Sequence, residues 1–396
     1  MNTLLFARTG LRILPKSSSQ VEKQTRETTV ASSTNGRSAL IIKIVSFNTV
    51  INAIGFFISH YLTKGLNRKV VLRSISEMRH LQQLDDRIRF VVLTEQDREF
   101  DPEELGVEVA FIPNSYEAPL ARYKARSLEY FRKLQSLRAD DWILHLDEET
   151  GVDEHCVRAC IGFIERTSYE WGQGIKVYNT MNYWKNPILT FVEVSRFRDD
   201  LTCFNFQHGT LHQTIWGCHG SFLLASGKIE NLVTWDTSSL AEDYWFGLKA
   251  SQLGYGSGWI PSIAREQSNW LLSDYFYQRR RWFWGIWSVG SFGRFRAITW
   301  LLSSLEVPFF ILTAFGLVTV PTWLVTPIQL YSTSTSFSLL FAMLLQDLDA
   351  GLPIWRMALH LFLSPFLISI VSCVQTIVIC LAIMRPPEGF HIVEKQ

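Results

Sequence analysis

Two long apolar runs in the last quarter of the chain constrain its fold more than any other feature of the sequence. Residues 297–325 and 358–384 each exceed the roughly 20 residues that a helix needs to cross a bilayer. The sequence before them is mixed and charged, and the slightly positive mean hydropathy of +0.08 averages the two parts. We therefore predict a soluble domain up to about residue 296, followed by a membrane region with spans near the two runs.

Charges in and around these runs refine the prediction. Glu306 lies inside the first run, where a central charge costs about 2.5–3.5 kcal/mol on insertion scales, a cost that several Leu, Ile and Phe offset. Residues 336–345, between the runs, are apolar but short, and we expect an interfacial or re-entrant piece there. By the positive-inside rule, five arginines just before the first run predict that the preceding domain faces the cytosol: Arg279, Arg280, Arg281, Arg294 and Arg296.

Composition restricts the other possibilities. The net charge is 38 − 37 = +1, so no overall positive field favours nucleic acid as a partner. The six cysteines form no CxxC pair, and Cys156 and Cys160, one helical turn apart, are interpreted as packing residues. Residues 1–40 are rich in Ser, Thr, Arg and Lys and are expected to be disordered. The N-terminal segment comprises residues 1–57, and a membrane candidate at residues 39–59 overlaps its end.

From about residue 56 the chain alternates apolar strand patterns with helical spacing. This order predicts an α/β fold with a mostly parallel sheet and helices on both faces. The expected strands are 56–63, 89–94, 107–112 and 142–146, and the expected helices are 70–84 and 119–137.

The strand at 142–146 ends in three acids. Asp147 and Glu149 are two residues apart, so a locally extended chain would point both side chains the same way. Two carboxylates on one side suit Mg²⁺ or Mn²⁺ shared with a diphosphate. The alternative is an acidic turn with no ligand.

Two further motifs follow in the sequence. Glu242 and Asp243 open a predicted helix, where the helix dipole alone is a sufficient reason for acids. A Q-x-x-R-W pattern, formed by Gln278, Arg281 and Trp282, stands just before the first apolar run. A basic aromatic belt at a membrane surface is the competing interpretation of this pattern.

The three motifs in this order resemble the membrane-bound family 2 glycosyltransferases, which have a GT-A fold. The chain looks most like the Egghead-type β-1,4-mannosyltransferases, over about residues 58–300. The closer resemblance rests on short stretches: Thr63-Lys64-Gly65, Tyr123-Lys124-Ala125-Arg126, residues 143–150, Gly172-Gln173-Gly174 and Ala241-Glu242-Asp243. It implies a cytosolic GT-A domain at 58–296 and a membrane region at 297–396.

The resemblance also implies roles for single residues. Asp147 and Glu149 would hold Mg²⁺ or Mn²⁺ against the diphosphate of a nucleotide sugar. Asp243 would be the general base that deprotonates the acceptor hydroxyl, and Glu242 would orient Asp243 or the acceptor. The remaining positions would bind substrates: Glu95 the base or ribose, Lys124 and Arg281 the diphosphate, Gln278 and Trp282 the acceptor.

Some positions have other interpretations. Lys124 would equally suit a solvated helix face, and Glu95 stands where the family pattern has an aspartate, which leaves the nucleotide preference open. His145 is expected to be a packed core histidine. The loop 219–221 matches a family loop near the donor sugar. Four residues are assigned to the membrane interface: Arg279, Arg280, Trp284 and Trp287.

The resemblance implies an inverting hexosyltransferase in the endoplasmic reticulum or Golgi membrane. It would move mannose from GDP-mannose in β linkage onto a membrane glycolipid such as glucosylceramide. Two alternatives stay open: a processive β-polysaccharide synthase that uses a UDP-sugar, and a non-catalytic membrane scaffold with the same fold.

Overall fold

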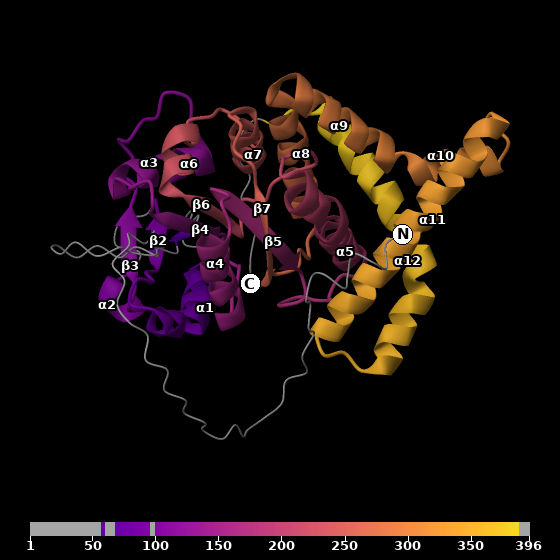
Figure 1. The fold of residues 1–396 in the computed structure, drawn as a ribbon. Coiled ribbons are helices and arrows are strands. Elements are labelled where there is room, and N and C mark those ends of the chain that lie inside the picture. Colours follow the sequence, from indigo (N-terminus) through magenta and orange to yellow (C-terminus); the bar gives the residue numbers. More distant parts are fainter. Residues whose placement is uncertain (1–56, 60–67, 96–99, 388–396) are drawn as a thin grey trace.

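The computed structural model describes residues 57–59, 68–95 and 100–387 (Figure 1). The predicted N-terminal segment 1–57 and the membrane candidate at 39–59 therefore lie outside the described residues, apart from 57–59.

A seven-stranded mixed sheet forms the centre of the first part of the chain, with strand order β3-β2-β1-β4-β6-β5-β7. Four of the six neighbouring pairs are parallel, and β6 runs antiparallel to both of its neighbours. The predicted α/β class with a mostly parallel sheet is confirmed. The strands are β1 Phe57–Ser59, β2 Val91–Thr94, β3 Glu108–Phe111, β4 Trp142–Leu146, β5 Trp171–Val177, β6 Leu223–Ser226 and β7 Gly258–Arg265.

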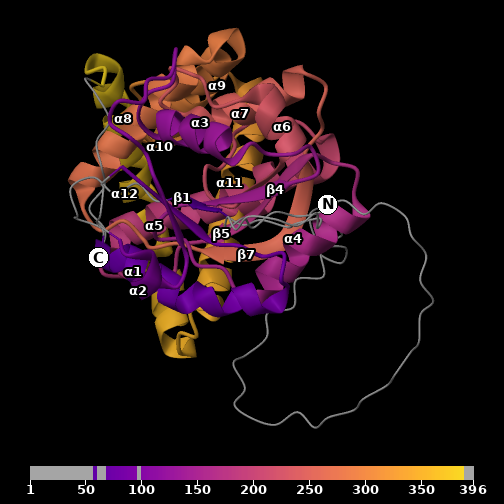
Figure 2. The ribbon, with the colours of Figure 1, turned by 90° about the vertical axis from the view of Figure 1, so that its left-hand side faces the viewer.

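Helices cover both faces of this sheet, as the GT-A-type fold requires. Figures 1 and 2 show α3, α6 and α7 on one face and α1 and α4 on the other. The helices and helical turns of this part are α1 Arg68–Met78, η2 Arg79–Leu84, α2 Pro102–Leu105, α3 Tyr123–Gln135, α4 Glu154–Arg166, α5 Pro187–Asp199, η3 Asp200–Phe204, η4 Gln207–Leu211, α6 Gly227–Val233, α7 Glu242–Gln252 and α8 Leu272–Ser288.

The local sequence explains the elements around β4. All five residues of β4 are buried, which fits a central strand covered on both faces. The Asp153 side chain accepts a hydrogen bond from the Cys156 amide and so caps α4. Cys156 and Cys160 are fully buried in the core, so their interpretation as packing residues is confirmed. His145 is also buried and is hydrogen-bonded to Glu230 at 2.8 Å, as expected for a core histidine.

A second group of helices lies at one side of the sheet domain, beyond α5 and α8 (orange to yellow in Figure 1). Within the described part of the chain, three helical segments are long and apolar enough to cross a membrane: 290–314, 322–349 and 354–384. They comprise α9 Gly290–Ser304, α10 Glu306–Ala314, α11 Thr322–Asp349 and α12 Ile354–Met384.

The structure corrects two details of the predicted membrane region. The run at 297–325 is not one helix, because the chain turns between α10 and α11, where Gly316 adopts a left-handed φ of +69°. Residues 336–345 are not a short re-entrant piece but part of the 28-residue α11. The Ser and Thr residues of α11 lower its apparent hydropathy, although hydroxyls such as that of Ser338 bond to carbonyls of the helix itself.

Asp347 joins this group of helices to the sheet domain. Its buried carboxylate accepts hydrogen bonds from Tyr183 Oη at 2.5 Å and Trp184 Nε1 at 2.9 Å, and it lies 2.7 Å from His360 Nδ1. The Trp184 and His360 rings stack with centroids 3.7 Å apart. Because this carboxylate of α11 has partners on α12 and in the loop before α5, it fixes how the two parts meet.

We predict that Asp347→Ala destabilises the protein by about 3 kcal/mol, because three polar groups that are buried or partly buried lose their common partner. The measurement is the midpoint of thermal unfolding in detergent. Asp140→Ala, at a partly exposed side chain, is the matched control and should change the midpoint little. Equal midpoints for the two variants would contradict the role assigned to Asp347.

Candidate active site

A cavity of about 1150 Å³ lies between the sheet domain and the C-terminal helices. It contains eight of the nine residues that the sequence analysis selected, although they come from four separate segments. These lining residues are Lys124, Asp147, Glu149, Glu242, Asp243, Gln278, Arg281 and Trp282.

Glu95, the ninth residue, does not line this cavity. It follows β2, and its carboxylate accepts hydrogen bonds from Arg126 Nη1 and Ser127 Oγ, both at 2.9 Å. A contact of Glu95 with a nucleotide base or ribose therefore stays a prediction.

The acids after β4 lie in a turn rather than in an extended segment. The Thr150 amide donates a hydrogen bond to the Asp147 carbonyl at 2.9 Å, and the Asp147 amide donates to Ser221 Oγ at 3.2 Å. The predicted extended conformation is therefore wrong. Asp147 and Glu149 nevertheless both line the cavity, whereas Glu148 between them is buried.

Lys124, in the first turn of α3, connects the two acid motifs. Its Nζ lies 2.5 Å from Asp147 Oδ1 and 3.7 Å from Glu242 Oε1, and the residue is only 8% exposed. Burial alone would lower the pKa of Lys124, but the carboxylates of Asp147 and Glu242 raise it above its ordinary value. Lys124 is thus a buried permanent cation and not a solvated helix residue.

The second acid motif opens α7, as predicted. Burial raises the pKa of Glu242 to about 7, against the opposing effect of the Lys124 charge. Burial also raises the pKa of Asp243, whose Oδ1 accepts a hydrogen bond from the Tyr244 amide at 2.8 Å. A carboxylate with a raised pKa near neutrality has the property that proton abstraction at physiological pH needs.

Gly220 leaves the space that the Lys124 and Asp243 side chains need at this end of the site. A Cβ at this position would lie 2.9 Å from Lys124 Nζ and 3.2 Å from Asp243 Oδ2, closer than side chains normally pack. The loop 219–221 also supports the first acid motif, because Ser221 Oγ contacts both the Asp147 amide and Thr150 Oγ1.

The Q-x-x-R-W motif lies on α8 and faces the same cavity. Asn269 Nδ2 donates a hydrogen bond to Gln278 Oε1 at 3.3 Å, and the positive charge of Arg281 opposes the rise in the pKa of Glu242 and Asp243. The Trp282 ring contacts two guanidinium groups, with the Cζ atoms of Arg279 and Arg196 at 4.3 and 4.9 Å from the ring centroid.

Arg279 departs from its predicted place at the membrane interface. It is 5% exposed and lines the cavity, and its guanidinium lies over the rings of Tyr275 and Trp282. Trp284, from the same predicted belt, donates its indole N–H to the carbonyl of Ala382 in α12 at 2.8 Å.

Two ion pairs that the sequence did not predict bring three further charged residues to the cavity lining: Lys176, Arg196 and Glu266. Lys176 Nζ lies 3.0 Å from Glu266 Oε1, and Arg196 Nη1 lies 2.6 Å from Glu193 Oε2. Burial would raise the pKa of Glu266, but the Lys176 and Arg196 charges lower it. A lysine inside the otherwise apolar end of β5 was the available signal, since a charge in a buried strand needs a partner.

The donor atoms of the site suit a divalent cation that is shared with a ligand. Asp147 and Glu149 supply hard carboxylate oxygens, the ligand type that Mg²⁺ and Mn²⁺ prefer. Across the described residues, no three His, Cys, Asp or Glu side chains group as a metal site on their own. The residues therefore fit an ion that takes its remaining ligands from water and phosphate oxygens.

Comparison with known proteins places these motifs in a family context. The family profile described as glycosyl transferase family group 2 matches residues 142–384. The chain is 30% identical over 203 residues to beta-1,4-mannosyltransferase bre-3 of Caenorhabditis elegans, covering 50% of this chain and 44% of that protein. It is 32% identical over 181 residues to beta-1,4-mannosyltransferase egh of Drosophila melanogaster, covering 44% of this chain and 39% of that protein. The chain thus spans less than half the length of these curated relatives.

Among solved structures, similarity extends to a mannosyltransferase from Pyrobaculum calidifontis in complex with GDP-Man and Mn²⁺. That match has a TM-score of 0.44 and 10% sequence identity, and it covers 81% of this chain and 86% of that chain.

We predict that Lys124→Met strengthens Mn²⁺ binding by more than about tenfold in the absence of nucleotide, because an ammonium group no longer competes for Asp147. Mn²⁺ titration followed by electron paramagnetic resonance measures the change. Lys133→Met is the control, at a half-exposed lysine of the same helix. Weaker binding by Lys124→Met than by the control would contradict the assignment of Asp147 as a cation ligand.

Proposed function

The chain belongs to glycosyl transferase family group 2, and we propose that it is an inverting mannosyltransferase. It transfers mannose from GDP-mannose, in β linkage, to a membrane glycolipid such as glucosylceramide. One observation carries the proposal: the acid turn after β4, the acid pair of α7 and the Q-x-x-R-W motif of α8 line one cavity, with Lys124 between the first two.

The donor end of the reaction uses the acid turn and the neighbouring cations. Asp147 and Glu149 hold Mg²⁺ or Mn²⁺, which supplies charge neutralisation for the diphosphate leaving group. Lys124 and Arg281 add positive charges that face the same group, and a guanidinium fits phosphate oxygens with two parallel hydrogen bonds. Glu95 contacts the base or ribose beyond the cavity.

The acceptor end uses the pair on α7. Asp243 takes the proton from the attacking hydroxyl, and Glu242 orients Asp243 or the acceptor. Burial supports this assignment, since it keeps the pKa of both carboxyls above the ordinary value while Lys124 preserves a negative charge on the pair. A single displacement at the anomeric carbon turns an α-linked donor into a β-linked product. Gln278 and Trp282 bind the acceptor.

Mannose as the transferred sugar is supported by the two β-1,4-mannosyltransferase relatives. A membrane acceptor is supported by the position of the cavity against three helices of membrane-spanning length. We further propose residence in the endoplasmic reticulum or Golgi membrane, with the 58–296 domain facing the cytosol on account of the arginines before α9 and the membrane region at 297–396.

The test is sugar transfer by membranes that contain the protein, with Mn²⁺ or Mg²⁺ and glucosylceramide as acceptor. GDP-mannose should be the donor that is used, and chelation of the metal should abolish transfer. Turnover of a UDP-sugar alone would contradict the mannosyltransferase assignment and favour a processive β-polysaccharide synthase. Folded protein that turns over no donor would favour a non-catalytic scaffold.

We predict that Asp243→Asn lowers kcat about 10²- to 10⁴-fold while donor binding is retained, because the amide cannot accept the hydroxyl proton. Initial transfer rates and GDP-mannose binding by calorimetry measure the two effects. Asp140→Asn, outside the cavity lining, is the control. Transfer by Asp243→Asn at the control's rate would exclude Asp243 as the base.

We also predict that kcat/KM rises with pH and levels off above about pH 7, because Glu242 is protonated below its raised pKa of about 7. Glu242→Gln removes the group with this pKa. Any increase of kcat/KM with pH that remains in this variant should therefore occur at lower pH. The pH dependence of kcat/KM between about pH 5 and pH 9 checks this. An unchanged profile in Glu242→Gln would show that another group sets the rise.

A further inference from the structure

The cavity does not end at the acid motifs but continues among the C-terminal helices. We call its far part the helix compartment and define it by six lining residues on four helices: Ser303 of α9, Glu306 and Phe310 of α10, Ser332 and Thr335 of α11, and Ser372 of α12. All six lie in segments long and apolar enough to cross a membrane. A single space therefore joins the acid motifs to the membrane region.

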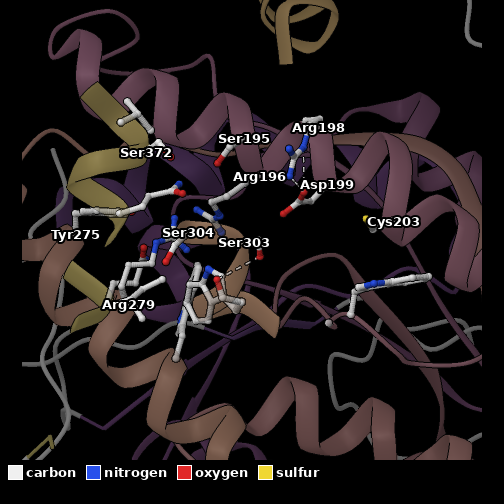
Figure 3. Close-up of a pocket in the computed structure, with 18 of the residues that line it drawn as sticks. Ser195, Arg196, Arg198, Asp199, Cys203, Tyr275, Arg279, Ser303, Ser304 and Ser372 are labelled. Atoms are coloured by element: carbon white, nitrogen blue, oxygen red, sulfur yellow. Dashed lines mark hydrogen bonds and ion pairs between the residues drawn. The ribbon is translucent and has the colours of Figure 1, made fainter. Parts of the chain in front are cut away.

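The near end of the helix compartment is polar. Figure 3 shows Ser303 and Ser372 around the same space as Arg196 and Arg279, which belong to α5 and α8. These two arginines in turn contact the ring of Trp282, in the Q-x-x-R-W motif. Hydroxyl and guanidinium groups thus follow directly on from the proposed acceptor residues.

Other lining residues of the helix compartment are apolar. Phe310, Ile311 and Ala314 line the cavity from α10. Glu306 accepts a hydrogen bond from Ser332 Oγ, so the carboxyl group is held by α11 and a polar contact joins the two helices at the cavity. A space with both apolar walls and hydrogen-bonding groups matches an amphiphile better than either a sugar chain or a pure hydrocarbon.

One face of α11 is turned to the cavity and another to its surroundings. Ser332, Thr335, Ser336 and Leu339 line the cavity at i, i+3, i+4 and i+7, the spacing of one helical face. Thr333, two residues before Thr335 and about 200° away around the helix, is exposed and does not line the cavity. Ser332, Thr335, Ser336 and Leu339 therefore form a cavity-lining face of α11 that does not include Thr333.

We propose that the helix compartment binds the acceptor lipid itself, with its hydrocarbon chain along Phe310, Ile311 and Ala314 and its polar linkage at Ser303, Glu306 and Ser372. The inference rests on the proposed function, because it takes the acceptor to be a glycolipid. It adds that the enzyme draws this lipid in among α9–α12, so that the length of the hydrocarbon chain contributes to acceptor recognition.

The first test compares acceptors that differ only in chain length. Thr335→Trp fills the helix compartment, and Thr333→Trp puts the same side chain at an exposed position of α11 that does not line the cavity. Transfer of mannose to a glucoside with a long alkyl chain, relative to one with a short chain, should fall at least tenfold in Thr335→Trp and stay as in the unaltered protein in Thr333→Trp. An equal ratio in both variants would overturn the proposal.

The second test does not depend on catalysis. A long-chain alkyl glucoside with a diazirine in the middle of its chain is photolysed with the full-length protein in vesicles, and labelled residues are mapped by mass spectrometry. Label on the cavity-facing residues of α10 and α11, lost in Thr335→Trp but kept in Thr333→Trp, is the expected result. Label only on exposed positions such as Thr333 and Phe337 would overturn the proposal.

The two tests separate the inference from the proposed function. If the unaltered protein transfers mannose to neither glucoside, the proposed function fails and the labelling pattern alone decides whether the helix compartment binds lipid. Ala314→Phe, a second filling variant at another lining residue, replaces Thr335→Trp if the latter does not fold. It should reduce labelling in the same way, and full labelling of folded Ala314→Phe would overturn the proposal.

Discussion

The buried ammonium of Lys124 is the interaction on which the arrangement of this site depends. Asp147, Glu242 and Asp243 bring three carboxyls into one cavity, where like charges in a poorly hydrated space repel strongly. Lys124 contacts one acid from each motif, so its positive charge offsets the repulsion between the carboxylates. It also links the end of β4 to the start of α7. Gly220 leaves room for the Lys124 and Asp243 side chains beside it.

The acids differ in their distance from this ammonium group and in their burial. Asp147 lies 2.5 Å from Lys124 Nζ and presents its carboxylate to the cavity, the position that suits a cation ligand. Glu242, farther from the ammonium and fully enclosed, has a pKa raised to about 7. Burial therefore raises the proton affinity of Glu242, and the Lys124 charge opposes that rise.

The junction with the C-terminal helices is polar rather than only apolar. Asp347 collects three hydrogen-bonding partners there, and Asp349 accepts from Arg265 at 2.9 Å and Asn179 at 2.7 Å. Directional contacts of this kind fix an orientation more strictly than apolar packing does. A fixed junction keeps the cavity continuous between the acid motifs and the helix compartment.

Local patterns in the sequence were sufficient to predict several strands, helices and acid motifs of this protein. The buried run at 142–146, the acids that follow it and the acids at the start of α7 are properties of neighbouring residues, and so are the long apolar helices. The sequence could not give the turn at 147–150, the inward direction of Arg279 or the extent of α11, since each depends on what packs against it. Nor could it show that Lys176 pairs with Glu266 or that the Arg196 charge lowers the pKa of Glu266, because these residues come from separate elements. Periodicity and residue chemistry act over a few neighbouring positions, whereas ion pairs and a cavity shared by distant segments exist only after the chain has folded.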